Sequence, residues 1–295
     1  MLTLEYLADL LAQHRSAGQA RVKEFRIGDQ AFAFNSRPAV MGVVNLSTDS
    51  WYRESVCLSA EQAIQRGKVQ HEQGADIIDV GAESTLAHAA RVDDAGQNSK
   101  LLPVIRGLRA ANILVSVETY QPAVTRACLE AGANILNLTG TDRSDELFRM
   151  VAAHDAAVII CYVQGKNVRE VGDFNFTADS TAMMRDYFAR QIEIAQRNGV
   201  EKIFIDPGLG FYYRNLQDSA IRVRHQMTTF LNTFRLRELG FPTCHALPHA
   251  FEYFGDEVRS AEPFFAVLAA LGKTDLFRTH EVPRIRAVLK TLKNF

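Results

Sequence analysis

Six short apolar runs of this chain end in polar or charged side chains that could form one binding site together. Continuous apolar runs are typical of buried strands, and a polar group at such an end costs free energy unless a partner compensates for it. Ionised carboxylates form strong bonds with N–H groups, and arginine binds anions through its planar fork of donors. The shared pattern therefore predicts one polar site, with Asn45, the segment Asp79 to Thr85, Glu118, Asn137, Asp206 and the segment Arg278 to His280.

The spacing of these runs predicts eight strand–helix units between residue 38 and the C-terminus. We expect strands near 38–44, 76–80, 113–117, 134–137, 157–162, 202–206, 242–246 and 275–279. Helices are expected near 59–74, 98–111, 121–132, 144–154, 179–198, 216–239, 260–272 and 281–293. Several of them end at a glycine, such as Gly74, Gly132 and Gly199, which is a common helix stop.

Eight such units are typical of a (β/α)8 TIM barrel, in which the C-terminal ends of all strands surround one mouth. An open doubly wound sheet usually has fewer strands and a GxGxxG motif after the first, and no such motif follows Val44. Any one of the polar strand ends could be an ordinary loop or cap residue. Their joint position at one mouth favours a site.

Residues 1–37 are expected to form a separate element on the barrel of residues 38–295. The segment Leu2 to His14 has apolar residues at helical spacing, which predicts an amphipathic helix packed on the barrel. The segment Lys23 to Asn35 alternates around Gly28-Asp29 and predicts a short hairpin. This hairpin could cover one end of the barrel.

Composition argues against several classes of function. The 295 residues are 47% hydrophobic, which is enough to form a core without disulfide bonds or structural metal ions. The net charge of −1 gives no support for nucleic-acid binding. No apolar stretch reaches the roughly 18 residues of a membrane span, and the first fifteen residues do not resemble a secretory signal. The four cysteines lack a CxxC spacing and are expected to be reduced, in a cytoplasmic protein.

Taken in order and spacing, the polar segments resemble the dihydropteroate synthase family of pterin-binding barrels. The resemblance runs from about residue 21 to the C-terminus. Any single motif is weakly specific, whereas six in register are strongly specific for the family and less so for the activity. The segments are Met41 to Trp51, Asp76 to Thr85, Val115 to Tyr120, Ile135 to Asn137, Asp206 to Phe211 and Arg278 to Val282.

The resemblance implies an enzyme that joins a dihydropterin pyrophosphate to p-aminobenzoate in folate synthesis and releases pyrophosphate. Asp206 matches the carboxylate that binds the pterin edge, and Asn137 matches an asparagine that offers the pterin a donor and an acceptor. Glu118 takes the place of a family aspartate and is one methylene longer.

The resemblance also implies a phosphate site at the same mouth. Arg278, His280 and Thr85 match family contacts to the leaving phosphates, and Asn45 matches an asparagine associated with Mg²⁺ and pyrophosphate. We expect Asn45, Arg278 and His280 to act in catalysis by stabilising the departing negative charge. Mg²⁺ would keep most of its waters and need few protein ligands. The family also implies a homodimer, with the apolar helix 260–272 as a suitable surface.

The chain departs from the family mainly around the second substrate. After strand seven the family has serine, arginine, lysine and serine, whereas this chain has Pro248-His249-Ala250-Phe251. Loop two has lost its arginine and proline, which are replaced here by Leu86 and Ala87. Other replacements are expected to reshape the pterin slot or make its mouth more aromatic, namely Trp51, Tyr162, Val163, Tyr212 and Tyr213.

These departures predict a synthase-like enzyme with weakened or altered activity, acting on p-aminobenzoate or on a different amine. One alternative is a non-catalytic pterin or folate binder, because basic groups are lost around an otherwise intact slot. Another is a pterin-dependent methyl or one-carbon transferase, although Asn45 and Arg278 would then have no phosphate to hold. A zinc hydrolase is a weaker alternative: His245 and His249 are four residues apart, but Pro248 disfavours a helix there and no third ligand is evident.

Overall fold

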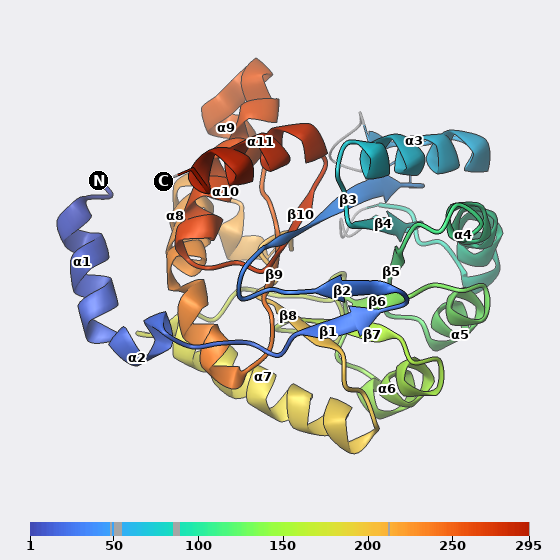
Figure 1. Cartoon of the computed structure of the whole chain (residues 1–295), viewed down its shortest axis with the longest axis horizontal. Coiled ribbons are helices and arrows are strands. Elements are labelled where there is room, and N and C mark those ends of the chain that lie inside the picture. The colour runs from blue at the N-terminus through green and yellow to red at the C-terminus, as the bar shows by residue number, and fades with distance from the viewer. Residues whose placement is uncertain (48, 50–54, 85–88, 212, 295) are drawn as a thin grey trace.

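Eight parallel strands form a closed ring in the computed structural model, which describes residues 1–47, 49, 55–84, 89–211 and 213–294 (Figure 1). Their order is β8-β7-β6-β5-β4-β3-β10-β9. The ring closes where Ile205 pairs with Thr243, and the Ile205 N–H donates to the Pro242 carbonyl at 3.0 Å. The predicted (β/α)8 barrel is confirmed, with strands β3 (Ala39–Asn45), β4 (Ile77–Gly81), β5 (Val115–Thr119), β6 (Ile135–Leu138), β7 (Ala157–Cys161), β8 (Ile203–Asp206), β9 (Cys244–Ala246) and β10 (Leu276–Thr279).

A helix follows each strand and packs on the outside of the ring. Several begin at a side chain that accepts a backbone N–H of the first turn, such as Ser59, Asp93 and Asp179, which satisfies donors that a helix start leaves unpaired. Phe148, Phe188 and Phe265 lie fully buried between helices and strands. The helices are α3 (Ala60–Glu72), α4 (Asp94–Arg109), α5 (Pro122–Glu130), α6 (Ser144–Ala153), α7 (Ser180–Arg197), α8 (Ser219–Asn232), α10 (Ala261–Leu271) and α11 (Val282–Leu292).

The long helix expected at 216–239 is divided in the structure. Helix α8 ends at Asn232, and a 3₁₀ segment, η3 (Thr233–Leu239), continues to Gly240, whose φ is +80°. The Thr233 hydroxyl donates to the Thr229 carbonyl at 2.9 Å, and side-chain bonds of this kind often bend helices. Short helices that were not expected are η2 (Arg214–Leu216), α9 (Phe251–Phe254) and η4 (Gly255–Ser260).

The N-terminal hairpin closes the barrel end opposite to the polar strand ends. Strands β1 (Phe25–Ile27) and β2 (Gln30–Phe32) pair antiparallel. Their apolar side chains join Phe34 in a cluster with Ile77 and Leu276, which begin their strands. Phe34 also meets Phe204 edge to face, with ring centroids 5.4 Å apart. Because this end is filled, a ligand can enter from the C-terminal mouth.

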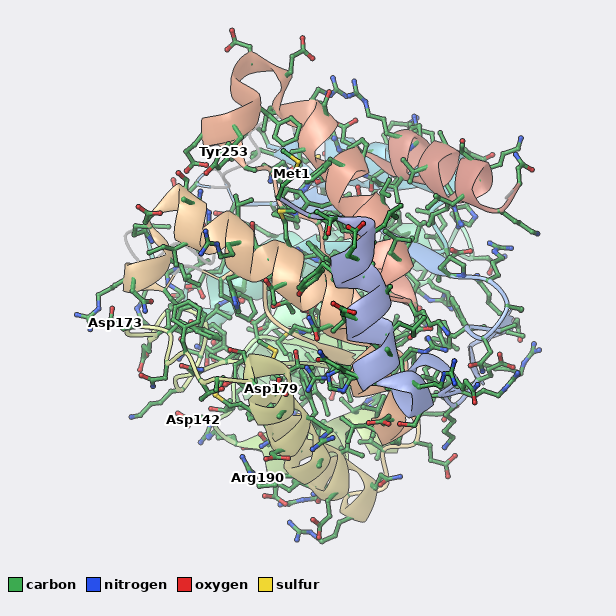
Figure 2. All side chains as sticks on the ribbon, turned by 90° about the vertical axis from the view of Figure 1, so that its left-hand side faces the viewer. Met1, Asp142, Asp173, Asp179, Arg190 and Tyr253 are labelled. Atoms are coloured by element: carbon green, nitrogen blue, oxygen red, sulfur yellow. The ribbon has the colours of Figure 1, made fainter. Side chains whose placement is uncertain are left out.

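The first helix lies at the side of the barrel (Figure 1). Helix α1 (Leu4–Gln13) buries no residue: Leu7 and Leu10 are partly buried against the core, whereas Leu4 and Leu11 are exposed. Figure 2, turned toward that side, shows α1 at the front of the molecule with Met1 at its upper end. The following short helix, α2 (Arg15–Gly18), packs on η3.

Two further expectations can be compared with the structure. All four cysteines are buried and form no disulfide, as expected for reduced thiols. Within the described part of the chain, no helix is both long enough and apolar enough to cross a membrane.

Candidate functional site

The predicted polar strand ends line one pocket at the C-terminal mouth of the barrel. Parallel pairing places Asn45 beside Gly81, Gly81 beside Glu118, and Glu118 beside Asn137. Asp206 pairs with Cys161 in the neighbouring part of the ring. The pocket wall includes every predicted site residue that the structure describes, namely Asn45, Glu118, Asn137, Asp206, Arg278 and His280. Thr85 lies outside the described residues, as do Trp51, Leu86 and Tyr212.

Arg278 is the centre of a charged cluster at the bottom of this pocket. Its Nε donates to Asp79 Oδ2 at 2.7 Å and its Nη2 donates to Glu118 Oε2 at 2.5 Å. Asn137 also donates to Asp79 Oδ2, at 3.2 Å. The side chain of Arg278 therefore faces the carboxylates of the expected pterin slot in this structure, and its expected role in phosphate binding stays a prediction.

Asp79 belongs to the predicted polar segment Asp79 to Thr85, but the sequence assigned it no role of its own. It is wholly buried in β4 and holds both Arg278 and Asn137. A signal was present in the sequence, because an aspartate interrupts the apolar run of this strand. A buried charge of this kind requires a partner, and the partner lies at the other end of the chain.

Two carboxylates of the pocket have pKa values close to neutral pH. Burial raises the pKa of Glu118 to about 7. The positive charge of Arg278 lowers this pKa, whereas the negative charges of Asp79 and Asp206 raise it further. Burial also raises the pKa of Asp206 to about 6. The Gly208 N–H, which donates to Asp206 Oδ1 at 2.7 Å, acts in the opposite direction and lowers this pKa. Loss of water around the charged form is the common cause. A ligand that donates N–H groups would favour the ionised form of both.

The tyrosines expected to reshape the slot are buried away from it. Tyr162 packs against Tyr187 of α7, with ring centroids 4.9 Å apart, and neither Tyr162 nor Val163 lines the pocket. Tyr213 is buried, and its hydroxyl accepts the Gln164 N–H at 2.9 Å. The expectation for these side chains was therefore wrong. Tyr162 and Tyr213 belong to the core cluster that contains Phe148 and Phe188, and Val163 belongs to the apolar cluster that contains the hairpin side chains.

A second unpredicted group holds the ends of loop two. Arg169 is buried beside Glu83, with 3.3 Å between Nη1 and Oε1, and Nη1 also donates to the Ser84 carbonyl at 3.0 Å. Its Nη2 donates to the Ala89 carbonyl. On the other side of Glu83, the Tyr120 hydroxyl donates to Oε2 at 2.9 Å. Glu83 lines the pocket, so this network positions one wall of the site.

The segment after β9 brings no lysine to the pocket. Ala250 is buried with a left-handed backbone (φ +46°) at the start of α9. Arg222 of α8 reaches the same wall and pairs with Glu252, with 2.5 Å between Nη2 and Oε1. Among the described wall residues, Arg222 and Arg278 are the lysine or arginine side chains.

Two histidines meet a buried glutamate at another part of the wall. Glu262 Oε1 lies 3.2 Å from His249 Nε2 and 2.9 Å from His280 Nδ1. Burial by itself would raise the pKa of Glu262, but hydrogen bonds from both histidines lower it well below its usual range. His245 does not join His249: it is buried on β9, its Nε2 lies 2.7 Å from the Thr233 hydroxyl, and burial lowers its pKa to about 3.

Comparison with known proteins agrees with this geometry. The family model described as pterin binding enzyme matches residues 41–241. The chain belongs to the pterin-binding enzyme family. A dihydropteroate synthase of Synechocystis sp. is 28% identical over 276 residues, which cover 90% of this chain and 92% of that protein. A probable bifunctional folylpolyglutamate synthase/dihydropteroate synthase of Halobacterium salinarum is 32% identical over 263 residues, 86% of this chain and 31% of that protein.

Solved structures are similar to this protein over nearly the whole chain. The Xanthomonas albilineans dihydropteroate synthase with 4-aminobenzoic acid superposes with a TM-score of 0.76 at 27% identity, covering 92% of this chain and 97% of that one. The same enzyme in complex with 7,8-dihydropteroate gives a TM-score of 0.74 at 25% identity, covering 92% and 98%. His249, Glu262 and His280 lie beyond the range that the family model matches.

Proposed function

We propose that this protein condenses a dihydropterin pyrophosphate with an amine in folate or pterin metabolism, as a dihydropteroate synthase does. In that reaction the amine nitrogen bonds to the pterin methylene carbon, the carbon–oxygen bond to pyrophosphate breaks, and the amine loses a proton. The observation that carries the proposal is the meeting of Glu118, Asn137 and Asp206 with Arg278 in one pocket. The similarity to dihydropteroate synthases along most of the chain supports it.

The pterin ring would lie against the deepest part of the pocket. Ionised Asp206 can accept two N–H groups of an aminopyrimidine edge, and Asn137 can both donate and accept. Glu118 would accept further N–H groups of the ring, but its Oε2 already accepts from Arg278. Pterin binding would therefore compete with Arg278 for Glu118. An Arg278 side chain displaced in this way could turn toward the pyrophosphate.

The phosphate end of the substrate would lie toward Asn45, His280 and the released arginine. The Asn45 side-chain nitrogen donates to the Ser55 hydroxyl at 2.5 Å, and the carbonyl oxygen of an asparagine is the atom that ligates Mg²⁺. Asn45 fits Mg²⁺ as a single protein ligand, because this ion keeps several waters and takes substrate phosphate oxygens. Bound Mg²⁺ would supply positive charge to the leaving group, and Asn45 would orient it.

The second substrate would meet an altered wall. Ala250 stands where the family has lysine, and the wall nearby consists of Leu247, Pro248 and Phe251 with the Arg222–Glu252 pair. We infer slow turnover with p-aminobenzoate, or preference for a different amine. A non-catalytic pterin binder is the second candidate, supported by the missing lysine. Methyl transfer from a folate is less well supported, because Asn45 and His280 would have no phosphate to bind.

Calorimetry with 6-hydroxymethyl-7,8-dihydropterin and its pyrophosphate tests the proposal. We expect binding to the wild-type protein and at least tenfold weaker binding to Asp206→Asn, whereas Asp186→Asn, at an exposed position of α7, should bind normally. Folded protein without measurable pterin affinity would refute the proposed function.

A product assay then separates the candidates. 7,8-Dihydropteroate and pyrophosphate formed from p-aminobenzoate would show the synthase reaction. Pterin binding without turnover of any tested amine would show a binder. The homodimer and the cytoplasmic location stay predictions.

A further inference from the structure

We propose that His249, Glu262 and His280 form a binding site for a divalent transition-metal ion, with Zn²⁺ best matched to the donor set. Two imidazole nitrogens and one carboxylate oxygen are the ligands of many catalytic zinc sites, which keep a further position open. This site differs from the Mg²⁺ position at Asn45 in its ligands and in its elements. Its existence is independent of the proposed function, whereas its suggested role rests on that function.

The three ligand atoms converge from separate elements of the fold. His249 follows β9, Glu262 lies in the first turn of α10, and His280 follows β10. The atoms all lie within 4.8 Å of one another, and Glu262 Oε1 is 3.2 Å and 2.9 Å from the two histidine nitrogens. Ligand atoms around a tetrahedral Zn²⁺ are about 3.3 Å apart when the metal–nitrogen distance is about 2.0–2.1 Å. Small side-chain rotations would complete the geometry.

Outer hydrogen bonds hold the carboxylate in the required orientation. Glu262 Oε2 accepts from the Thr279 hydroxyl and from the backbone N–H groups of His280 at 3.1 Å and Glu281 at 3.3 Å. Oε1 faces the two imidazoles. Partners of this kind orient metal ligands and tune their affinity.

Charge and burial point to a cation at this place. Glu262 is completely buried, and a buried carboxylate requires positive charge nearby. Arg278, two residues earlier, is engaged with Asp79 and Glu118. A divalent ion between the two histidines would compensate the negative charge of Glu262.

The site is also reachable from the pocket. His249 and His280 line the pocket and keep 13% of their side-chain surface exposed. An ion there would offer its open position to the pocket, beside Arg278. If the proposed function holds, an oxygen of the pyrophosphate could occupy that position. The ion would then supply positive charge on the wall where the family lysine is replaced by Ala250.

Metal titration of chelator-treated, full-length protein tests the inference. Calorimetry with ZnCl₂ should show one saturable site per chain, and CoCl₂ should give the visible absorption of tetrahedral Co²⁺. We expect His249→Ala and His280→Ala to weaken Zn²⁺ binding about tenfold or more and to remove the Co²⁺ spectrum. His154→Ala, at an exposed position after α6, is the matched control and should bind like the wild type.

Glu262→Gln alters a completely buried, hydrogen-bonded carboxylate and is expected to destabilise the fold, so the two histidine variants carry the test. The inference would be overturned if folded wild-type protein shows no saturable Zn²⁺ binding. It would also be overturned if both histidine variants bind Zn²⁺ as tightly as the wild type does. Dihydropterin calorimetry on the same chelator-treated samples keeps the two proposals apart. Pterin binding without metal binding would refute only the metal site, and metal binding without pterin binding would refute only the proposed function.

Discussion

Replacing Asp206 by asparagine should stabilise the protein while it weakens pterin binding. Asp206 is buried at the end of β8, and burial raises its pKa to about 6 from 3.8. The native state therefore holds this carboxylate charged at neutral pH at a cost. An asparagine keeps an oxygen that can accept the Gly208 N–H and carries no charge, so the substitution removes that cost.

The size and the sign of the change in unfolding free energy follow from the raised pKa of Asp206. A rise of about two pKa units corresponds to about 3 kcal/mol, at about 1.4 kcal/mol per unit. Burial of the new amide offsets part of this gain, so the free energy of unfolding should rise by roughly 1–3 kcal/mol at pH 7.5. Because the folded-state pKa is raised, the cost is complete above about pH 6 and vanishes below about pH 4. At pH 5 the gain should be about half as large.

Urea unfolding of wild type, Asp206→Asn and the surface control Asp186→Asn at pH 7.5 and pH 5 measures this difference. Calorimetry on the same samples should show at least tenfold weaker dihydropterin binding for Asp206→Asn alone. The reasoning would be refuted if Asp206→Asn unfolds more easily than wild type at pH 7.5. It would equally be refuted if the gain in stability does not shrink at pH 5.

Three further predictions concern other parts of the pocket. Dihydropterin affinity should rise from pH 5 to pH 8, because Glu118 and Asp206 ionise with pKa values of about 7 and about 6; a flat calorimetric profile would contradict this. Arg169→Met should lower the free energy of unfolding by about 3 kcal/mol in urea, because it leaves partly buried Glu83 without its cation, and unchanged stability would contradict it. Ala250→Lys should not restore full turnover with p-aminobenzoate, because position 250 is buried in a left-handed conformation; a product assay with Ala250→Gly as control checks it, and full activity would refute it.

The sequence by itself determined the barrel and the gathering of its polar strand ends. Apolar runs, glycine stops and helical periodicity are local signals, so they located the strands and helices to within a few residues. Once eight strand–helix units are recognised, barrel topology brings Glu118, Asn137 and Asp206 to one mouth. Their meeting in one pocket therefore required no knowledge of side-chain packing.

Only the tertiary structure decided which side chains pair with one another. Arg278 faces Asp79 and Glu118, Arg169 holds Glu83, and Tyr213 is buried behind the pocket. The third member of the histidine cluster, Glu262, lies on a helix whose rotation toward His249 and His280 depends on packing against α8 and α11. Such pairings join residues distant in the chain, and their geometry depends on how helices settle on the barrel. Local sequence patterns carry no information about that choice, and for this reason the strand ends were predictable and their partners were not.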